Sequence, residues 1–276
     1  MQSSSSDLFK EDNVLTIKTV QVAPFRILMT ALKEILVETN IVFQEDGIKI
    51  TSMDKSHTIL VYLSLDALKF QQFECKQKKI VIGVNIPHLY KLINQMDNDE
   101  TLTMYIEKAN YTDGIVSYLG LKYENGNIKQ CKTYKLKLIE PDLEETVYPN
   151  VNFSSIINLP SSDFQKIIRD LTTISEKIEI KSVGNELIFK SSGGQFAEVI
   201  INRAESNDSL EFSLKPDSSK IIQGEFSLKN LGYFIKCTNL CPQIELYLEN
   251  DLPLVIKYNV ADLGEIKLCL SPLPSC

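Results

Sequence analysis

The chain has 276 residues, of which 43% are hydrophobic and 24% charged, and its 36 acidic and 29 basic side chains give a net charge of −7. This length suits two domains of about 130 to 140 residues better than a single core. No apolar run approaches the length of a membrane span, and the polar first residues lack the features of a signal or transit peptide. An acidic chain also argues against nucleic-acid binding, unless its bases gather on one surface.

Amphipathic helices are predicted at four places by apolar spacing: 24–36, 87–96, 160–175 and 228–237. The third follows Pro160, and its Ser162 and Gln165 have the spacing of a capping box, which predicts a well-defined start. In all four helices, bases lie on the face opposite the apolar one: Arg26, Lys33, Lys91, Lys166, Arg169, Lys229 and Lys236.

Short apolar runs of strand type follow each helix: 41–43, 48–50, 59–65, 102–107, 178–180, 187–189 and 244–249. The helices and strands of the second half repeat those of the first at an offset of about 140 residues. The chain therefore looks like a tandem duplication. Two helices and mostly antiparallel strands in each half predict an α+β architecture.

The middle of the chain, 138–152, is rich in acidic residues, contains two prolines and shows no period. These features predict an exposed connector. Just before it, Tyr134, Leu136 and Leu138 alternate with lysines, as in a strand near a sheet edge. The predicted organisation is a disordered extension at 1–13, an N-terminal domain at 14–137, the connector at 138–152 and a C-terminal domain at 153–276.

No motif for catalysis, metal binding or cofactor binding is found. The chain has two histidines, His57 and His88, and no nucleophile elbow, Walker loop or dinucleotide fingerprint. Cys237 and Cys241 have no nearby histidine, so we interpret them as structural thiols. We expect no enzyme activity, no cofactor and no metal. We also expect free thiols in a reducing compartment at Cys75, Cys131, Cys237, Cys241, Cys269 and Cys276.

Three segments resemble proliferating cell nuclear antigen, the family of eukaryotic and viral DNA sliding clamps. They are TSMDKSHT at 51–58, LPSSDFQKIIRDL at 159–171, and LPLVIKYNVADLG at 252–264 with Leu270-Ser271-Pro272. The resemblance implies the DNA-clamp fold, with two similar domains per chain. It further implies a head-to-tail ring of three chains whose helices line the hole. The implied function is that of a DNA polymerase processivity factor and docking platform for replication and repair proteins.

The resemblance also implies where partners bind. The seven helix bases would contact the phosphates of duplex DNA without sequence preference. A groove for partner peptides would be formed by Met53, His57, Thr146, Tyr148, Pro149, Pro253, Leu270, Ser271 and Pro272. Trimer contacts would join Tyr134, Leu136 and Leu138 of one chain to Phe196, Val199 and Ile201 of the next. The expected partners are a DNA polymerase, a clamp loader and other clamp-binding proteins, in the nucleus or at a cytoplasmic viral replication site, with no membrane.

Several positions depart from the family pattern. Thr146 stands where an apolar residue is usual, Cys269 where an aromatic is frequent, and Gly184 where a ubiquitin-modified lysine is common. With the polar extension and the missing acidic tail, they indicate a divergent member, for which a large DNA virus is one source to consider. Two alternatives stay open: a monomeric or dimeric processivity factor of the herpesvirus type, and a protein-binding scaffold without DNA contact.

Overall fold

The computed structural model describes residues 12–142, 144, 146–206, 209–217 and 219–274. The chain forms two compact units. Unit 1 contains the described residues of 1–50, 63–145 and 262–264, and unit 2 contains those of 51–62, 146–261 and 265–276. The units differ from the predicted domains because two short segments, 51–62 and 262–264, are exchanged. Of the predicted extension, residues 1–11 lie outside the described residues, as does Cys276, whereas Asn13 already begins a strand.

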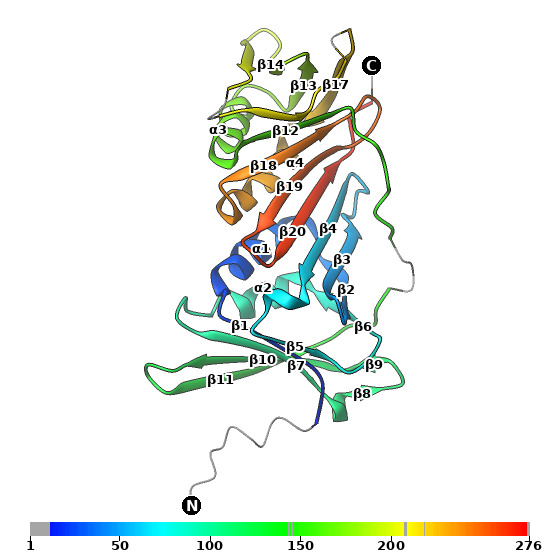
Figure 1. Cartoon of the computed structure of the whole chain (residues 1–276), viewed down its shortest axis with the longest axis vertical. Helices are drawn as coiled ribbons and strands as arrows, with labels where there is room; N and C mark the ends of the chain where they lie inside the picture. Colours follow the sequence, from blue (N-terminus) through cyan, green and yellow to red (C-terminus); the bar gives the residue numbers. More distant parts are fainter. Residues whose placement is uncertain (1–11, 143, 145, 207–208, 218, 275–276) are drawn as a thin grey trace, which may run out of the picture. The chain divides into compact units, whose positions relative to one another are not determined.

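Unit 1 contains two helices and a five-stranded antiparallel sheet in the order β11-β10-β7-β1-β5 (Figure 1). Strand β2 pairs with β3 and β6, and α1 packs against α2. Strands β3 and β4 contribute residues to both units. The elements are β1 (Asn13–Thr19), α1 (Val22–Ile35), β2 (Glu38–Gln44), β3 (Gly47–Met53), β4 (Ile59–Asp66), η1 (Ala67–Lys69), β5 (Gln72–Cys75), β6 (Lys79–Asn85), α2 (Ile86–Ile93), β7 (Thr101–Glu107), η2 (Lys108–Asn110), β8 (Tyr111–Thr112), β9 (Ile115–Val116), β10 (Tyr118–Asn125) and β11 (Gln130–Lys137).

Unit 2 repeats this plan with two helices, a four-stranded antiparallel sheet in the order β15-β14-β13-β17, and the neighbouring strands β16-β12-β18-β19-β20. Its helix α3 packs against α4 and η3. The elements are β12 (Ser155–Pro160), α3 (Ser161–Thr172), β13 (Lys177–Val183), β14 (Glu186–Ser192), β15 (Glu198–Ala204), β16 (Glu211–Leu214), β17 (Ile221–Ser227), α4 (Leu228–Phe234), η3 (Ile235–Leu240), β18 (Gln243–Leu248), β19 (Leu254–Val260) and β20 (Gly264–Leu270).

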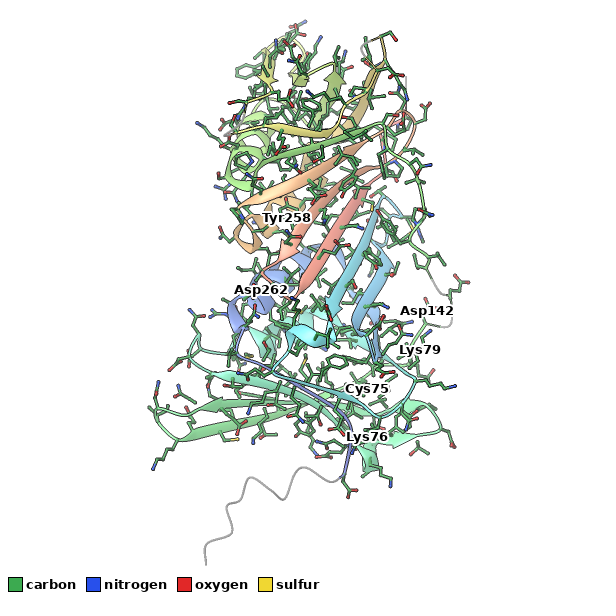
Figure 2. The ribbon with its side chains drawn as sticks, viewed as in Figure 1. Cys75, Lys76, Lys79, Asp142, Tyr258 and Asp262 are labelled. Carbon is green, nitrogen blue, oxygen red and sulfur yellow. The ribbon has the colours of Figure 1, made fainter. Side chains whose placement is uncertain are left out.

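The α+β architecture with mostly antiparallel sheets is confirmed. Each α-helix begins within three residues of the end of a strand, and its apolar face is buried, as the spacing predicts. Alternate residues of the strands complete each core. In β19, for example, Tyr258 is fully buried (Figure 2). Among the described residues, no helix is both long and apolar enough to cross a bilayer.

Two details of the helix ends differ from the prediction. The capping box at Ser162 is wrong: α3 starts at Ser161, its N-cap position is Pro160, and no side chain caps it. Gln165 instead donates through Nε2 to the Ile235 carbonyl at 3.2 Å, because α3 packs on η3. The fourth helix is α-helical only to Phe234 and continues as a 3₁₀-helix.

Glu249, directly after β18, forms contacts whose strength depends on pH. The carboxylate of Glu249 accepts hydrogen bonds from Ser154 Oγ and from Lys220 Nζ, the latter at 2.9 Å. Burial acts to raise the pKa of this carboxyl, but these hydrogen bonds outweigh it and lower the pKa from 4.5 to about 2. A depressed carboxyl pKa stabilises the folded chain above pH 4.5, and this stabilisation is lost as the pH falls toward 2.

We therefore expect Glu249→Gln to lower the free energy of unfolding at pH 7 by about 1 to 2 kcal/mol. The variant should also lose less stability than the wild type between pH 4.5 and 2. Thermal melts across this range measure both effects. Glu186→Gln on β14, at an exposed side chain with no ion pair among the described residues, is the control. Parallel pH curves for wild type and Glu249→Gln would contradict the assignment.

Candidate nucleic-acid interface and partner groove

The predicted bases of unit 1 lie on its two packed helices. Arg26 and Lys33 are half-exposed on α1, and Lys91 is exposed on α2. Arg26 donates through Nη1 to Asn98 Oδ1 at 2.9 Å, so its guanidinium is partly held. Lys33 lies 2.9 Å from Glu34 Oε1 and 4.6 Å above the ring of Tyr90. The hydrogen bond with Glu34 is the main cause that raises the pKa of Lys33, which therefore remains charged at neutral pH.

In unit 2, the bases Lys166 and Arg169 on α3, Lys229 on α4 and Lys236 on η3 are all exposed. None of the four forms an ion pair within the part of the chain that the structure describes. The acidic Asp163 of α3, by contrast, is paired with Arg203 of β15 at 2.8 Å. Pairing partly neutralises one acid beside the bases, and anions can approach the exposed cations freely.

The predicted trimer strands lie at sheet edges, as expected from their alternation. β11 and β15 are the outermost strands of the five-stranded and four-stranded sheets. Phe196 beside β15 is 79% exposed, and Val199 and Ile201 are half-exposed. On β11, Tyr134 packs on the ring of Tyr123 at 5.1 Å between centroids.

Two of the predicted contact residues are covered by their own unit. Leu136 is 7% exposed and Leu138 is 9% exposed, because alternation turns Leu136 to the core face of β11. They cannot offer much surface to another chain. Ile200 lies inside the predicted contact strand but is not among its named contact residues, and it is 56% exposed on β15. The sequence signal for it is the apolar run at 199–201, which continues through Ile200.

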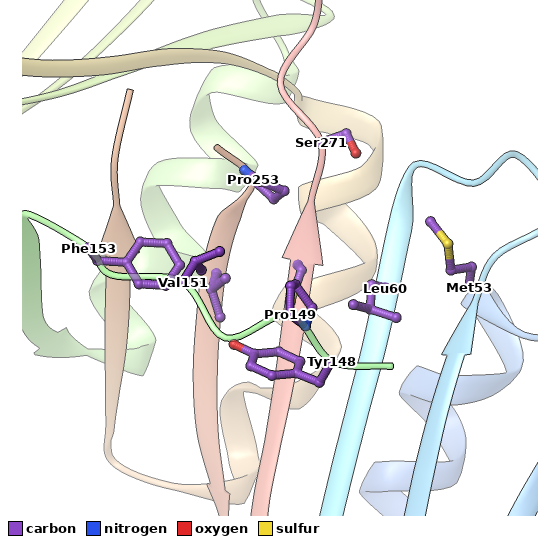
Figure 3. Close-up of a pocket in the computed structure, with 10 residues that line it drawn as sticks. Met53, Leu60, Tyr148, Pro149, Val151, Phe153, Pro253 and Ser271 are labelled. Carbon is purple, nitrogen blue, oxygen red and sulfur yellow. The ribbon is translucent and has the colours of Figure 1, made fainter. Parts of the chain in front are cut away.

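Unit 2 contains an apolar cavity of about 130 Å³ beside the end of the connector (Figure 3). Five of the predicted groove residues line it: Met53, Tyr148, Pro149, Pro253 and Ser271. The lining residues that the sequence analysis missed are Leu60, Val151, Phe153, Val255 and Cys269. Alternation could have found Leu60, which is apolar although both of its neighbours in β4 are buried on the other face.

Four predicted groove residues do not line the cavity. Leu270 is 1% exposed, because in β20 it points to the face opposite Cys269 and Ser271. Its placement in the groove is therefore wrong. His57 is exposed in the turn that follows β3, with φ of 55°. Thr146 and Pro272 are close in sequence to the lining residues Tyr148 and Ser271, but they do not line the cavity.

Aromatic contacts hold the connector end against the sheet. The ring of Tyr148 lies 4.9 Å from that of Tyr62, and Lys267 Nζ lies 5.3 Å from the Tyr148 centroid. Phe153 packs edge-on to Tyr247 at 5.5 Å. Burial raises the pKa of the Tyr148 hydroxyl, and it raises the pKa of the Cys269 thiol to about 12. Both groups are therefore neutral, and the cavity suits an uncharged, apolar side chain.

The turn at 54–58 is ordered by one carboxylate. Asp54 Oδ1 accepts hydrogen bonds from the backbone N–H groups of Thr58 at 2.8 Å and Ile59 at 2.7 Å. Burial acts to raise the pKa of Asp54, but hydrogen bonds from Ser56 and the backbone outweigh it and lower the pKa. The charged carboxylate thus fixes the hairpin that carries Met53 at the cavity rim.

Comparison with known proteins identifies the family. Residues 14–146 match the family model "Proliferating cell nuclear antigen, N-terminal domain", and residues 147–273 match the model of its C-terminal domain. The chain is 29% identical over 267 residues to the probable DNA polymerase sliding clamp 1 of Paramecium bursaria Chlorella virus 1. This match covers 96% of this chain and 99% of that protein. It is 31% identical over 229 residues to the probable DNA polymerase sliding clamp of Acanthamoeba polyphaga mimivirus, covering 82% of this chain and 47% of that protein. Because the two matched models are successive domains of one family and together span residues 14–273, the chain belongs to the proliferating cell nuclear antigen family.

Proposed function

We propose that the protein is a DNA sliding clamp. In this role it encircles duplex DNA and acts, without enzymatic activity of its own, as a polymerase processivity factor and docking platform. The supporting observation is that seven bases lie exposed or half-exposed on the helices of a chain with net charge −7. Contacts of these cations with phosphate do not depend on base sequence, so they allow movement along the duplex.

The ring is proposed to be a homotrimer closed by β11 of one chain and β15 of the next. A contact between two different edges propagates head to tail and covers both unpaired strands. We expect a trimer mass by light scattering at micromolar concentration. A trimer would exclude the monomeric and dimeric alternatives, and a ring without salt-sensitive DNA binding would favour the scaffold alternative.

Ile200→Lys tests this contact. The new charge on β15 would face the lysines of the neighbouring β11, so we expect the mass to fall to that of a monomer while the fold persists. The matched control is Ile221→Lys, because Ile221 is 51% exposed and Ile200 is 56% exposed, but Ile221 lies on β17 at the other edge of the same sheet. If the Ile200→Lys variant is still a trimer, the contact between chains does not involve this part of β15.

The cavity beside Tyr148 is proposed to receive the apolar anchor of a partner peptide. Tyr148→Ala removes part of the cavity wall and the ring packed on Tyr62, so the affinity for a polymerase-derived peptide should fall about tenfold or more. Titration calorimetry measures this affinity. Tyr118→Ala, at a tyrosine 37% exposed on β10, is the control and should bind the peptide normally. Equal binding by both variants would place the peptide at another surface.

The proposed partners are duplex DNA, a DNA polymerase, a clamp loader and other proteins with clamp-binding motifs. The proposed place of action is a site of DNA replication, either the nucleus or a cytoplasmic viral replication site. The two viral relatives, both named as probable DNA polymerase sliding clamps, support this assignment.

A further inference from the structure

The connector is fastened to unit 1 by an asparagine side chain. Asn40 on β2 donates through Nδ2 to the carbonyl oxygen of Asp142 at 2.7 Å. The Oδ1 atom of Asn40 accepts a hydrogen bond from the backbone N–H of Asp142 at 2.9 Å. The amide of Asn40 thus satisfies both backbone groups of Asp142, a residue labelled in Figure 2. This pairing fixes the backbone at one point of a connector whose described residues form no helix and no named strand.

A glycine permits a second contact just before this point. The N–H of Ile139 donates to the Gly83 carbonyl on β6 at 3.0 Å. A Cβ at position 83 would lie 2.6 Å from the carbonyl oxygen of Ile139 and 2.7 Å from that of Glu140. Both are backbone atoms, so an alanine would have to push the connector away from β6. We call Asn40 and Gly83 the connector anchor.

The other end of the connector forms one wall of the cavity in unit 2. Tyr148, Pro149 and Val151 line the cavity, and Phe153 continues the wall. Six residue steps separate Asp142 from Tyr148, and six steps of extended chain span at most about 20 Å. Leu143 and Glu145, within this span, lie outside the described residues. From this short span we expect that releasing Asp142 gives the cavity wall more freedom.

We propose that Asn40 and Gly83 are positioning residues for partner binding, because they fix the connector at Asp142 and so restrict the wall at 148–153. This inference rests on the proposed function of the cavity. A partner that binds against an already ordered wall loses less entropy than one that must order it. Neither anchor residue lines the cavity, so the effect would be transmitted through the chain. Loss of the anchor should raise the dissociation rate of a partner more than it changes the association rate.

Two variants of the full chain test the proposal. Asn40→Ala removes both hydrogen bonds to Asp142, and Gly83→Ala displaces the connector from β6. With a labelled polymerase-derived peptide as the probe, we expect Asn40→Ala to bind about three- to tenfold more weakly, through faster dissociation. Without peptide, the amides of 146–152 should exchange hydrogen faster than in the wild type. Asn40→Asp keeps the acceptor but places a carboxylate oxygen against the Asp142 carbonyl, so it should bind no more tightly than Asn40→Ala.

Asn158→Ala is the matched control. Asn158 is also half-exposed on a strand, and its Nδ2 donates to Ser213 Oγ at 2.7 Å, away from the connector. The control should keep wild-type affinity and exchange. If Asn40→Ala and Gly83→Ala bind like the wild type, the positioning role is wrong, even if exchange is faster. If the wild type itself does not bind the peptide, the proposed function of the groove is wrong. Unchanged hydrogen exchange of the amides of 146–152 in Asn40→Ala would show, independently of peptide binding, that the anchor does not restrict the cavity wall.

Discussion

Replacing Arg26, Lys33, Lys166 and Arg169 together by glutamate should abolish the stimulation of DNA polymerase on long templates. Each substitution turns a phosphate-attracting charge into a repelling one, and each lost phosphate contact reduces the salt dependence of binding by about one unit of slope. All four side chains are exposed or half-exposed, so melting temperature and trimer mass should change little. Product length on primed long templates and DNA binding across a salt series measure the effect.

The control for this variant reverses four lysines that lie outside the helices α1 to α4. Lys69, Lys78, Lys108 and Lys129 are all exposed, and their replacement by glutamate makes the same change in net charge. If both variants lose processivity equally, net charge alone is responsible. If the helix variant keeps full processivity, the helices do not face DNA and the proposed function must be withdrawn.

The second large effect is expected in the core of unit 2. Ile168 is fully buried and Ile167 is 6% exposed on α3. Truncating either to alanine should lower the free energy of unfolding by about 2 to 5 kcal/mol, because the removed atoms leave a cavity. That is a large part of the stability of a typical domain. Urea unfolding followed by circular dichroism measures the change.

Lys166→Ala provides the matched comparison, because it lies one position from Ile167 on the same helix and is exposed. Its cost should be within about 0.5 kcal/mol. Similar costs for Lys166→Ala and Ile168→Ala would mean that α3 does not bury the face assigned to it, and the separation of a core face from a DNA face would fail.

The sequence predicts local features of this fold well and long-range ones poorly. Helical spacing places Ile168 in the core and Lys166 in solvent, because both depend on one helix burying one face. Leu270 was misplaced because its side of β20 depends on register, and a shift of one residue reverses every side chain. The start of α3 was misread because Gln165 finds a partner in η3, which is distant in sequence.

In the groove, too, the features that depend on local sequence are predicted, and those that depend on distant contacts are not. Proline and tyrosine in the connector mark Tyr148 and Pro149 as surface residues, and the family pattern places them at the groove. Val255 and Cys269 lie in strands whose apolar residues all read as core, so nothing local separates the cavity wall from the interior. The role of Asn40 has no sequence signal, because its partner is the backbone of a residue 102 positions away.

The exchange of segments between the two units bears on the order in which the chain can fold during synthesis. Unit 1 includes Leu263, whose carbonyl accepts from the Asp66 N–H at 2.8 Å, and Gly264, whose missing side chain leaves room for the backbone at Ser64. A ribosome that has made the first half of the protein has not yet supplied these residues. Unit 1 is therefore complete only when translation is almost finished, and a polypeptide released early lacks the backbone partner of Asp66 at the end of β4.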